Sequence, residues 1–305
     1  MINQLNTGLS PKYFAAHLPL YPIFIRIFSL FGYLRSMLLV NFLFTVLLSI
    51  FFYYILRKWQ VTKYPLLLVI VFLFLPRFLV VRSIGAPESL FILLVLASLV
   101  FFEKENYLLA GFFGGLSAMT KTPGILLFAA YVFVLIERLL KTKKINWSMI
   151  WLLLIPTGLI SVFFIYWIQY GDFLAYFHTG GLVPMSFPFS VFNFNDKWVG
   201  TAWLEDIIFY FFLYGYTVIA LKNSKYRSFF YFTLIFFIAT TLVDHRDIAR
   251  YSLPLWPLAC IALEQFFTSR KFLLVFIVLL PAIYLYAWNF LLYNQMPISI
   301  WRPFL

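Results

Sequence analysis

Ten apolar runs follow one another along this chain, and they restrict its fold more than any short motif does. A helix that crosses a bilayer needs about 20 apolar residues, and fewer when other helices bury it. The pattern predicts an all-α fold, a polytopic transmembrane helical bundle of about ten hydrophobic segments. The runs occupy residues 37–56, 65–81, 87–102, 107–120, 123–139, 148–169, 203–221, 228–243, 252–268 and 272–292.

Composition favours the same fold. Only 11% of the 305 residues are charged and 64% are hydrophobic, whereas a soluble domain carries roughly 25% charged residues. No long polar or low-complexity tract separates the runs, so we expect residues 1–305 to form a single transmembrane domain. Cys260 is the single cysteine, which excludes an intramolecular disulfide and a cysteine metal site.

The net charge of +12 reflects the distribution of Lys and Arg, and we expect no nucleic-acid partner. If the runs simply alternate in direction, five basic loops fall on one side. They hold 13 of the 23 Lys and Arg residues, which indicates the cytoplasmic side. These loops are 57–63, 103–106, 137–144, 222–227 and 268–271.

The opposite side receives most of the uncommon polar residues. It includes 1–36, expected to be an external interfacial segment, and 170–202, expected to be an external loop that covers a site. Apolar residues at Leu20, Ile23, Ile27 and Leu30 have the spacing of a helix that lies on a membrane surface.

The most polar stretch on that side is "VDHRDIARYSLPLWP", residues 243–257. If it begins a helix, Arg246 and Arg250 are four residues apart and share a face, so they can converge on one phosphate or pyrophosphate. The alternative is a loop in which Asp244 and Asp247 neutralise the arginines.

Four other positions have both a functional and a structural interpretation. Arg77 is a candidate for lipid phosphate binding, and Glu88 is either a site residue or a favourable charge at a helix N-terminus. Lys121, at the predicted turn "KTPG", either binds phosphate or extends its ammonium to the membrane surface. Asp172 and His178 fit a helix cap as well as a site, and His17 fits an amphipathic anchor.

Motifs of soluble enzymes are absent, including GxxxxGK, GxGxxG, HExxH and GxSxG. With three His and one Cys, the chain is a poor candidate for an electron carrier. We expect no cofactor, and no ligand pattern supports a divalent metal.

Several segments, in their order along the chain, resemble the GT-C polytopic glycosyltransferases. They are "HLPLYPIFIRIF", "APESLFILLVLASLVFFEKENYLLAGFFGGLSAMTKTPGILL", "YGDFLAYFH" and "DIARYSLPLWPLACIA". The nearest branches are the GPI mannosyltransferase 2 type, the dolichyl-phosphate-mannose enzymes and the bacterial polyprenyl-sugar transferases. The resemblance implies transfer of a hexose, mannose first, from a polyprenyl-phosphate-linked donor to a lipid, glycan or protein acceptor. The reaction would occur on the non-cytoplasmic face, and a bacterial plasma membrane is favoured over the endoplasmic reticulum.

The resemblance also implies roles for particular residues. Lys121 and Arg250, with its neighbour Tyr251, are expected to bind the donor phosphate, and Arg246 and Arg77 are weaker candidates. Acceptor contacts or a catalytic base are expected among His17, Glu88, Asp172, Asp244 and Asp247.

One departure from the family pattern concerns the catalytic base, a carboxylate in the first external loop of such enzymes. This chain has no Asp or Glu before Glu88. We therefore expect either that the first helix and catalytic loop are missing from this sequence or that it is a non-catalytic relative. A transporter or flippase of a lipid-linked or anionic solute is the alternative from another functional class.

Overall fold

The computed structural model describes residues 11–143, 146–179, 184–192 and 204–293, and its regular structure within these ranges is entirely helical. The prediction of an all-α fold is confirmed, and each of the ten apolar runs contains helix. The elements are η2 (Pro11–Ala16), α1 (Leu20–Ile27), η3 (Ser29–Phe31), α2 (Tyr33–Lys58), α3 (Pro65–Leu73), α4 (Pro76–Arg82), α5 (Glu88–Glu103), α6 (Tyr107–Thr120), η4 (Thr122–Ile125), α7 (Leu126–Thr142), η5 (Trp147–Leu153), α8 (Leu154–Tyr170), α9 (Ala175–His178), η6 (Ser190–Phe192), α10 (Glu205–Leu221), α11 (Arg227–Thr241), α12 (Ile248–Tyr251), η7 (Leu253–Leu255), α13 (Trp256–Ala262), α14 (Glu264–Phe267) and α15 (Arg270–Tyr293).

Four helical stretches in the described residues are long and apolar enough to cross a membrane. They are α2, η4 with α7 (Thr122–Lys141), η5 with α8 (Trp147–Tyr170), and α15 (Arg270–Leu292). The bent pair α3 and α4 makes a fifth if it is one span. With these helices the chain has the character of a membrane protein.

The bend between α3 and α4 measures 75° and follows from Pro76. Leu75 has an extended backbone, as expected before proline, and Pro76 has no N–H to give to the carbonyl of Phe72. The indole Nε1 of Trp256, in α13, donates to that carbonyl at 2.9 Å. The break leaves the carbonyl of Phe72 without the N–H donor that residue 76 would supply in a continuous helix. A side chain from α13 satisfies this buried acceptor instead.

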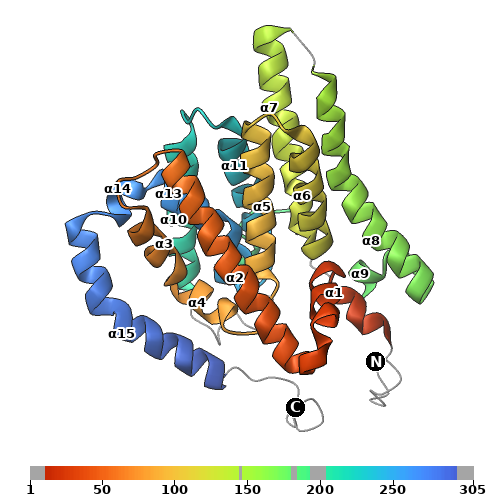
Figure 1. Ribbon diagram of the computed structural model, residues 1–305, viewed down its shortest axis with the longest axis horizontal. Coiled ribbons are helices and arrows are strands. Elements are labelled where there is room, and N and C mark those ends of the chain that lie inside the picture. Colours follow the sequence, from red (N-terminus) through yellow and green to blue (C-terminus); the bar gives the residue numbers. More distant parts are fainter. Residues whose placement is uncertain (1–10, 144–145, 180–183, 193–203, 294–305) are drawn as a thin grey trace.

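Helix α5 occupies the middle of the bundle, with α2 and α6 beside it (Figure 1). Nearly every residue of α5 is buried, as expected for a helix that is apolar all round. Helix α6 packs between α5 and α8, and α7 packs on α11, while α15 lies at the periphery and contacts α4 (Figure 1).

Most of the basic loops gather at one end of the bundle, in the upper part of Figure 1, and the joint of α14 and α15 lies lower, at the left. Ion pairs and hydrogen bonds join them there. Arg227 Nε donates to Glu137 Oε2 at 2.9 Å, and the backbone N–H of Ser228 donates to Glu103 Oε1 at 2.8 Å. We call this end the basic end.

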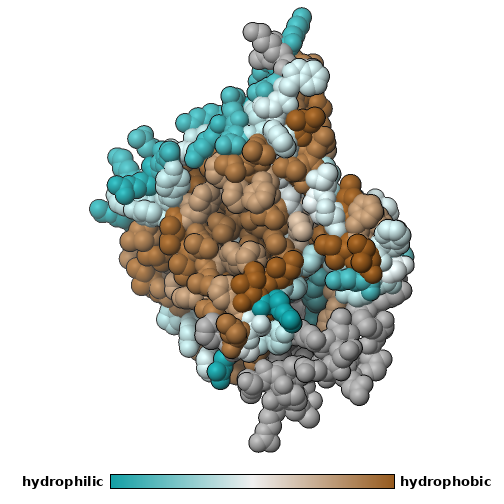
Figure 2. Space-filling model, turned by 45° about the vertical axis from the view of Figure 1, so that its right-hand side comes forward, coloured by the Kyte–Doolittle hydropathy of each residue, from teal (hydrophilic) through white to brown (hydrophobic). Residues whose placement is uncertain are grey.

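Apolar side chains cover much of the outer surface between the two ends (Figure 2). Leu274, Ile277 and Val278 of α15 are exposed, as are Phe164 and Ile168 of α8. In Figure 2 the brown surface is bordered above by teal, hydrophilic residues. Soluble proteins rarely expose apolar area of this extent, so the surface fits contact with lipid.

The predicted external segments are partly described. In 1–36, Leu20 is buried, whereas Ile23, Ile27 and Leu30 are exposed and can contact a membrane surface. Helix α2 already begins at Tyr33, four residues before the apolar run. Residues 1–10 and parts of 170–202, namely 180–183 and 193–202, lie outside the described residues.

Glycines let α6 approach η5 and α8 closely. A Cβ at Gly111 would lie 2.0 Å from the carbonyl oxygen of Trp151, and one at Gly158 would lie 2.6 Å from the carbonyl oxygen of Gly115. Backbone therefore meets backbone along this contact, as in other small-residue helix pairs.

We predict that Gly111→Ala lowers the free energy of unfolding by about 1–3 kcal/mol, because the added methyl forces two backbones apart. Gly215→Ala is the control: its Cβ would meet Phe237 at an ordinary 3.5 Å. That variant should be neutral or gain up to about 1 kcal/mol from helix propensity. Thermal unfolding of the purified chain in detergent measures both, and equal midpoints would contradict the close packing.

Candidate functional site

Three charged side chains meet at the end of the bundle opposite the basic loops. Lys121 Nζ donates to Glu88 Oε1 at 2.9 Å, and Arg250 Nε donates to the same oxygen at 2.7 Å. The Glu88 side chain is 1% exposed, and its Oε2 has no hydrogen-bond partner among the described residues. We call these three residues the Glu88 cluster.

Polar residues of α2 fix the position of Glu88 at the start of α5. Asn41 Nδ2 donates to the carbonyl oxygen of Val81 at 2.8 Å and also to that of Ile84, in the turn before α5. The hydroxyls of Thr45 and Ser89 are 2.8 Å apart. These bonds explain why the apolar run 37–56 carries the buried residues Asn41 and Thr45. Polar residues within an apolar run are the feature of the sequence from which these contacts could have been predicted.

Lys121 is placed by the break between α6 and α7. It has an extended backbone at the C-terminal cap of α6, and the 3-10 helix η4 follows directly. Gly124 packs against α6 so closely that a Cβ would lie 2.5 Å from the backbone nitrogen of Ala118. The predicted turn at "KTPG" is confirmed, and it directs the Lys121 side chain toward α5.

Arg250 belongs to the single-turn helix α12. The backbone N–H groups of Arg250 and Tyr251 both donate to the carbonyl oxygen of Asp247, at 3.0 and 3.1 Å. Because the helix begins only at Ile248, the prediction that Arg246 and Arg250 share one helix face is wrong. Arg246 is exposed, while Arg250 reaches Glu88.

A second ion pair lies beside the cluster. Arg77, in α4, bonds Asp247 through Nη2 and Oδ2, and its side chain is only 8% exposed. The guanidinium also lies 4.2 Å from the ring centroid of Phe290 in α15. The backbone N–H of Asp247 donates to His245 Nδ1 at 2.9 Å. Asp247 is thus neutralised by Arg77 of α4, and not by Arg246 or Arg250 of its own stretch as the salt-bridged loop would require.

Aromatic and hydroxyl groups complete the surroundings of Lys121. Its ammonium lies 5.7 Å from the ring centroid of Tyr251, and Thr122 Oγ1 lies 3.1 Å from the hydroxyl of Tyr176. Neither Thr122 nor Tyr176 was among the site residues predicted from the sequence. Tyr176 lies inside the segment "YGDFLAYFH", and Thr122 follows Lys121 directly.

His17 belongs to the rim of this region rather than to its centre. Its side chain is exposed, and its carbonyl oxygen accepts a hydrogen bond from the Tyr166 hydroxyl at 3.0 Å. Partial burial of the imidazole lowers the pKa of His17 below its usual 6.5, and the charge of Arg250 lowers it further.

Asp172 and Asp244, two other predicted carboxylates, lie in the segments that precede α9 and α12. Asp172 accepts from the backbone N–H of Leu174 at 3.0 Å and lies 2.8 Å from His178 Nδ1, so it forms a local turn and cap at α9. The interpretation of Asp172 as a helix cap is therefore favoured over a role in the site. Asp244 is partly buried in the segment before α12.

The cluster can bind an anion. A single carboxylate faces two cations, and the side chains of Lys121 and Arg250 are 19% and 34% exposed. Arg250 uses Nε for Glu88, and its terminal nitrogens make no hydrogen bond to a described residue in addition. Within the described ranges no group of three or more His, Cys, Asp or Glu residues could hold a metal ion.

Comparison of the chain with protein-family models, curated proteins and solved structures found no match. The resemblance to the GT-C glycosyltransferases therefore rests on the sequence segments quoted above. The geometry of the Glu88 cluster is the second, independent basis for a functional proposal.

Glu88→Gln should lower the free energy of unfolding by about 1–3 kcal/mol, because two partly buried cations lose their counter-ion. The full penalty of a buried pair is not expected, since both cations retain some contact with solvent. Glu105→Gln is the control: Glu105 is 68% exposed and lies 3.5 Å from Arg138. It should change the free energy of unfolding by less than about 1 kcal/mol. Equal losses in denaturant titrations would contradict the role of Glu88.

Acidic pH should lower the stability of the folded chain through His245. Burial lowers the pKa of His245 below its usual 6.5, Asp247 opposes this, and the neighbouring arginines add to it. As the pH falls, the unfolded chain therefore binds a proton at His245 before the folded chain does. The stability that the neutral His245 contributes to the fold is complete above pH 6.5 and is lost as the pH falls through the lower pKa of the folded state. His245→Asn keeps an acceptor for the Asp247 N–H but cannot titrate. Thermal midpoints of the variant should fall less than those of the wild type between pH 7.5 and 5, and identical slopes would contradict this.

Proposed function

We propose that this chain is a membrane-embedded sugar transferase of the GT-C type. It transfers a hexose, mannose being the first candidate, from a polyprenyl-phosphate-linked donor to a lipid, glycan or protein acceptor. The observation that carries the proposal is the convergence of Lys121 and Arg250 on one oxygen of the buried Glu88. These are the two residues that the family resemblance independently selects as donor-phosphate ligands.

The chemistry of the leaving group supports this assignment. When the bond between the anomeric carbon and the phosphate oxygen breaks, negative charge develops on the polyprenyl phosphate. Lys supplies a point charge and Arg a planar fork of donors, and both stabilise such charge most where water is scarce. The terminal nitrogens of Arg250 are the groups that would bind the phosphate, while Nε stays on Glu88.

Asp247 is our candidate for the base. Glu88 faces two cations, which stabilise its ionised form and weaken it as a proton acceptor. Asp247 is paired with one cation, Arg77, so its ionised form is stabilised less, and its side chain is more accessible, at 20% exposed against 1% for Glu88. In the proposed reaction the acceptor oxygen attacks the anomeric carbon, its proton passes to Asp247, and the phosphate departs with the bonding electrons.

The proposal places the Glu88 cluster on the non-cytoplasmic side. Its support is the position of the basic loops, which gather at the opposite end of the bundle (Figure 1) and by the usual bias face the cytoplasm. We propose about ten membrane segments in this arrangement and a bacterial plasma membrane as the location.

Transport of a lipid-linked or anionic solute is the second candidate. The observation in its favour is the pair of interrupted segments, α3 with α4 and α12 through α14. Transporters often build their sites from broken helices. The two candidates differ in the fate of the donor, which a transferase consumes and a transporter moves intact.

The test uses the purified chain in liposomes with radiolabelled undecaprenyl-phosphate mannose and a bacterial membrane extract as the source of acceptors. Arg250→Gln and Lys121→Gln should each reduce sugar transfer by on the order of 100-fold. Arg138→Gln is the matched control, because it removes the same charge from a residue paired with a glutamate at the basic end. It should retain at least about half of the wild-type rate, since exposed pairs contribute little.

Asp247→Asn should abolish transfer while the donor still binds. Movement of intact donor across the bilayer without transfer would favour the transporter. A wild-type chain that neither consumes nor moves the donor would remove both functions and leave a non-catalytic relative.

A further inference from the structure

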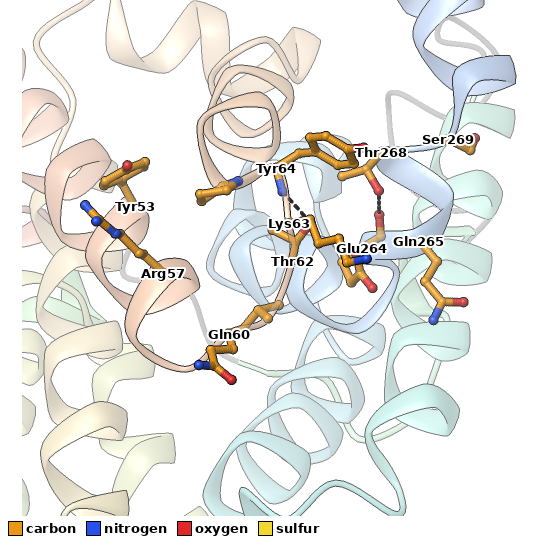
Figure 3. Close-up of a pocket in the computed structure, with 12 residues that line it drawn as sticks. Tyr53, Arg57, Gln60, Thr62, Lys63, Tyr64, Glu264, Gln265, Thr268 and Ser269 are labelled. Atoms are coloured by element: carbon orange, nitrogen blue, oxygen red, sulfur yellow. Dashed lines mark hydrogen bonds between the residues drawn. The ribbon is translucent and has the colours of Figure 1, made fainter.

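The basic end carries a pocket that the proposed reaction does not use. It has a volume of about 910 Å³ and lies between the end of α2, the loop to α3, and the joint of α14 with α15. Figure 3 shows Tyr53 and Arg57 on the α2 side and Glu264 and Gln265 on the α14 side. Lys63, from the connecting loop, lies between them (Figure 3).

The loop that forms one wall has a defined conformation. Gln60 adopts a left-handed backbone (φ 51°), and the N–H of Val61 donates to the carbonyl oxygen of Leu56 at 3.0 Å. This is the Schellman arrangement that ends many helices. Trp59 stacks on Tyr226 of the neighbouring loop, with ring centroids 4.2 Å apart. The pocket wall is therefore built in advance of any ligand.

The charges of the pocket favour an anion. Arg57 and Lys63 are both exposed, and neither lies within ion-pair distance of a carboxylate among the described residues. Glu264 is the carboxylate in the wall, which leaves a formal charge of +1 on the lining residues. Arg270 and Lys271 follow directly on Ser269 and add positive charge at the rim.

A second, apolar pocket of about 440 Å³ adjoins the first and shares Tyr53, Lys63, Tyr64 and Pro65 with it. It continues along α3 past Leu66, Leu67 and Ile70. Leu66 and Ile70 are exposed on the outer face of the bundle. A polar pocket at a helix end thus opens into an apolar groove that runs along the helix.

We propose that the two pockets together bind one anionic phospholipid of the phosphatidylglycerol class, from the leaflet that faces the basic end. Arg57 and Lys63 bind its phosphate, the glycerol hydroxyls bond to Glu264 and Gln265, and an acyl chain follows the groove along α3. A soluble phosphate would fill only the polar pocket, and a zwitterionic lipid such as phosphatidylcholine would add its own cation beside Arg57 and Lys63. The site does not depend on sugar transfer.

Native mass spectrometry of the purified full chain tests this with two added lipids of equal acyl chains, phosphatidylglycerol and phosphatidylcholine. The wild type should retain one phosphatidylglycerol in preference to phosphatidylcholine. Arg57→Gln/Lys63→Gln should weaken its binding at least roughly tenfold, as expected for loss of charge-assisted hydrogen bonds. Lys143→Gln/Lys222→Gln removes the same charge from exposed positions that do not line either pocket, and this variant should bind within about twofold of the wild type, because exposed charges that make no direct contact are screened.

Phosphatidylglycerol should also raise the thermal midpoint of the wild type and of the control variant, but not that of the double pocket variant. Equal loss of binding in both double variants would overturn the site. So would equal affinity of the wild type for the two lipids. Competition by soluble glycerol phosphate at similar concentrations would overturn the part played by the apolar groove.

Discussion

A carboxylate that is almost completely buried in an apolar bundle has to be neutralised, and Glu88 meets this need with two cations from separate helical segments. The requirement ties the start of α5 to the end of α6 and to α12. Arg250 then connects through α12 to Asp247, which pairs with Arg77 of α4. Arg77 in turn contacts Phe290 of α15. One buried charge thus determines which helices are neighbours at this end of the bundle, which the apolar pattern alone does not specify.

The same cluster is incompletely satisfied, and this distinguishes it from a purely structural ion pair. Glu88 Oε2 is buried without a partner among the described residues, and both cations retain contact with the surface. Buried polar groups are usually fully paired, so an orphan oxygen is costly. An anion that takes over part of the cationic charge, or a hydroxyl that donates to Oε2, would find favourable partners already in position. By contrast, the ion pairs at the basic end, such as Arg227 with Glu137, lie among loops and join α11 to α7.

The helical segments could be predicted from the sequence, because apolar runs and loop charges are local signals. Lys121 and Arg250 could also be selected, as the two cations that the family resemblance picks out. Their common partner could not, since the sequence offers a complete local explanation for Glu88 as a charge at a helix N-terminus. The prediction for Arg246 was wrong because the start of α12 is set by the backbone of Asp247, which no periodicity reveals. The 75° bend likewise needs Pro76 together with Trp256, a residue 180 positions away.

The close backbone contact between α6 and its neighbours has a mechanical consequence. Helices that touch through glycines have no side chains between them to repack, so we expect α6 and α8 to move together. Lys121, at the end of this pair, is a fixed point. Arg250 stands on a single helical turn followed by a 3-10 turn, a much softer support. We therefore expect any adjustment of the cluster to a bound anion to come from α12, which carries Arg250, while Lys121 keeps its position at the end of α6.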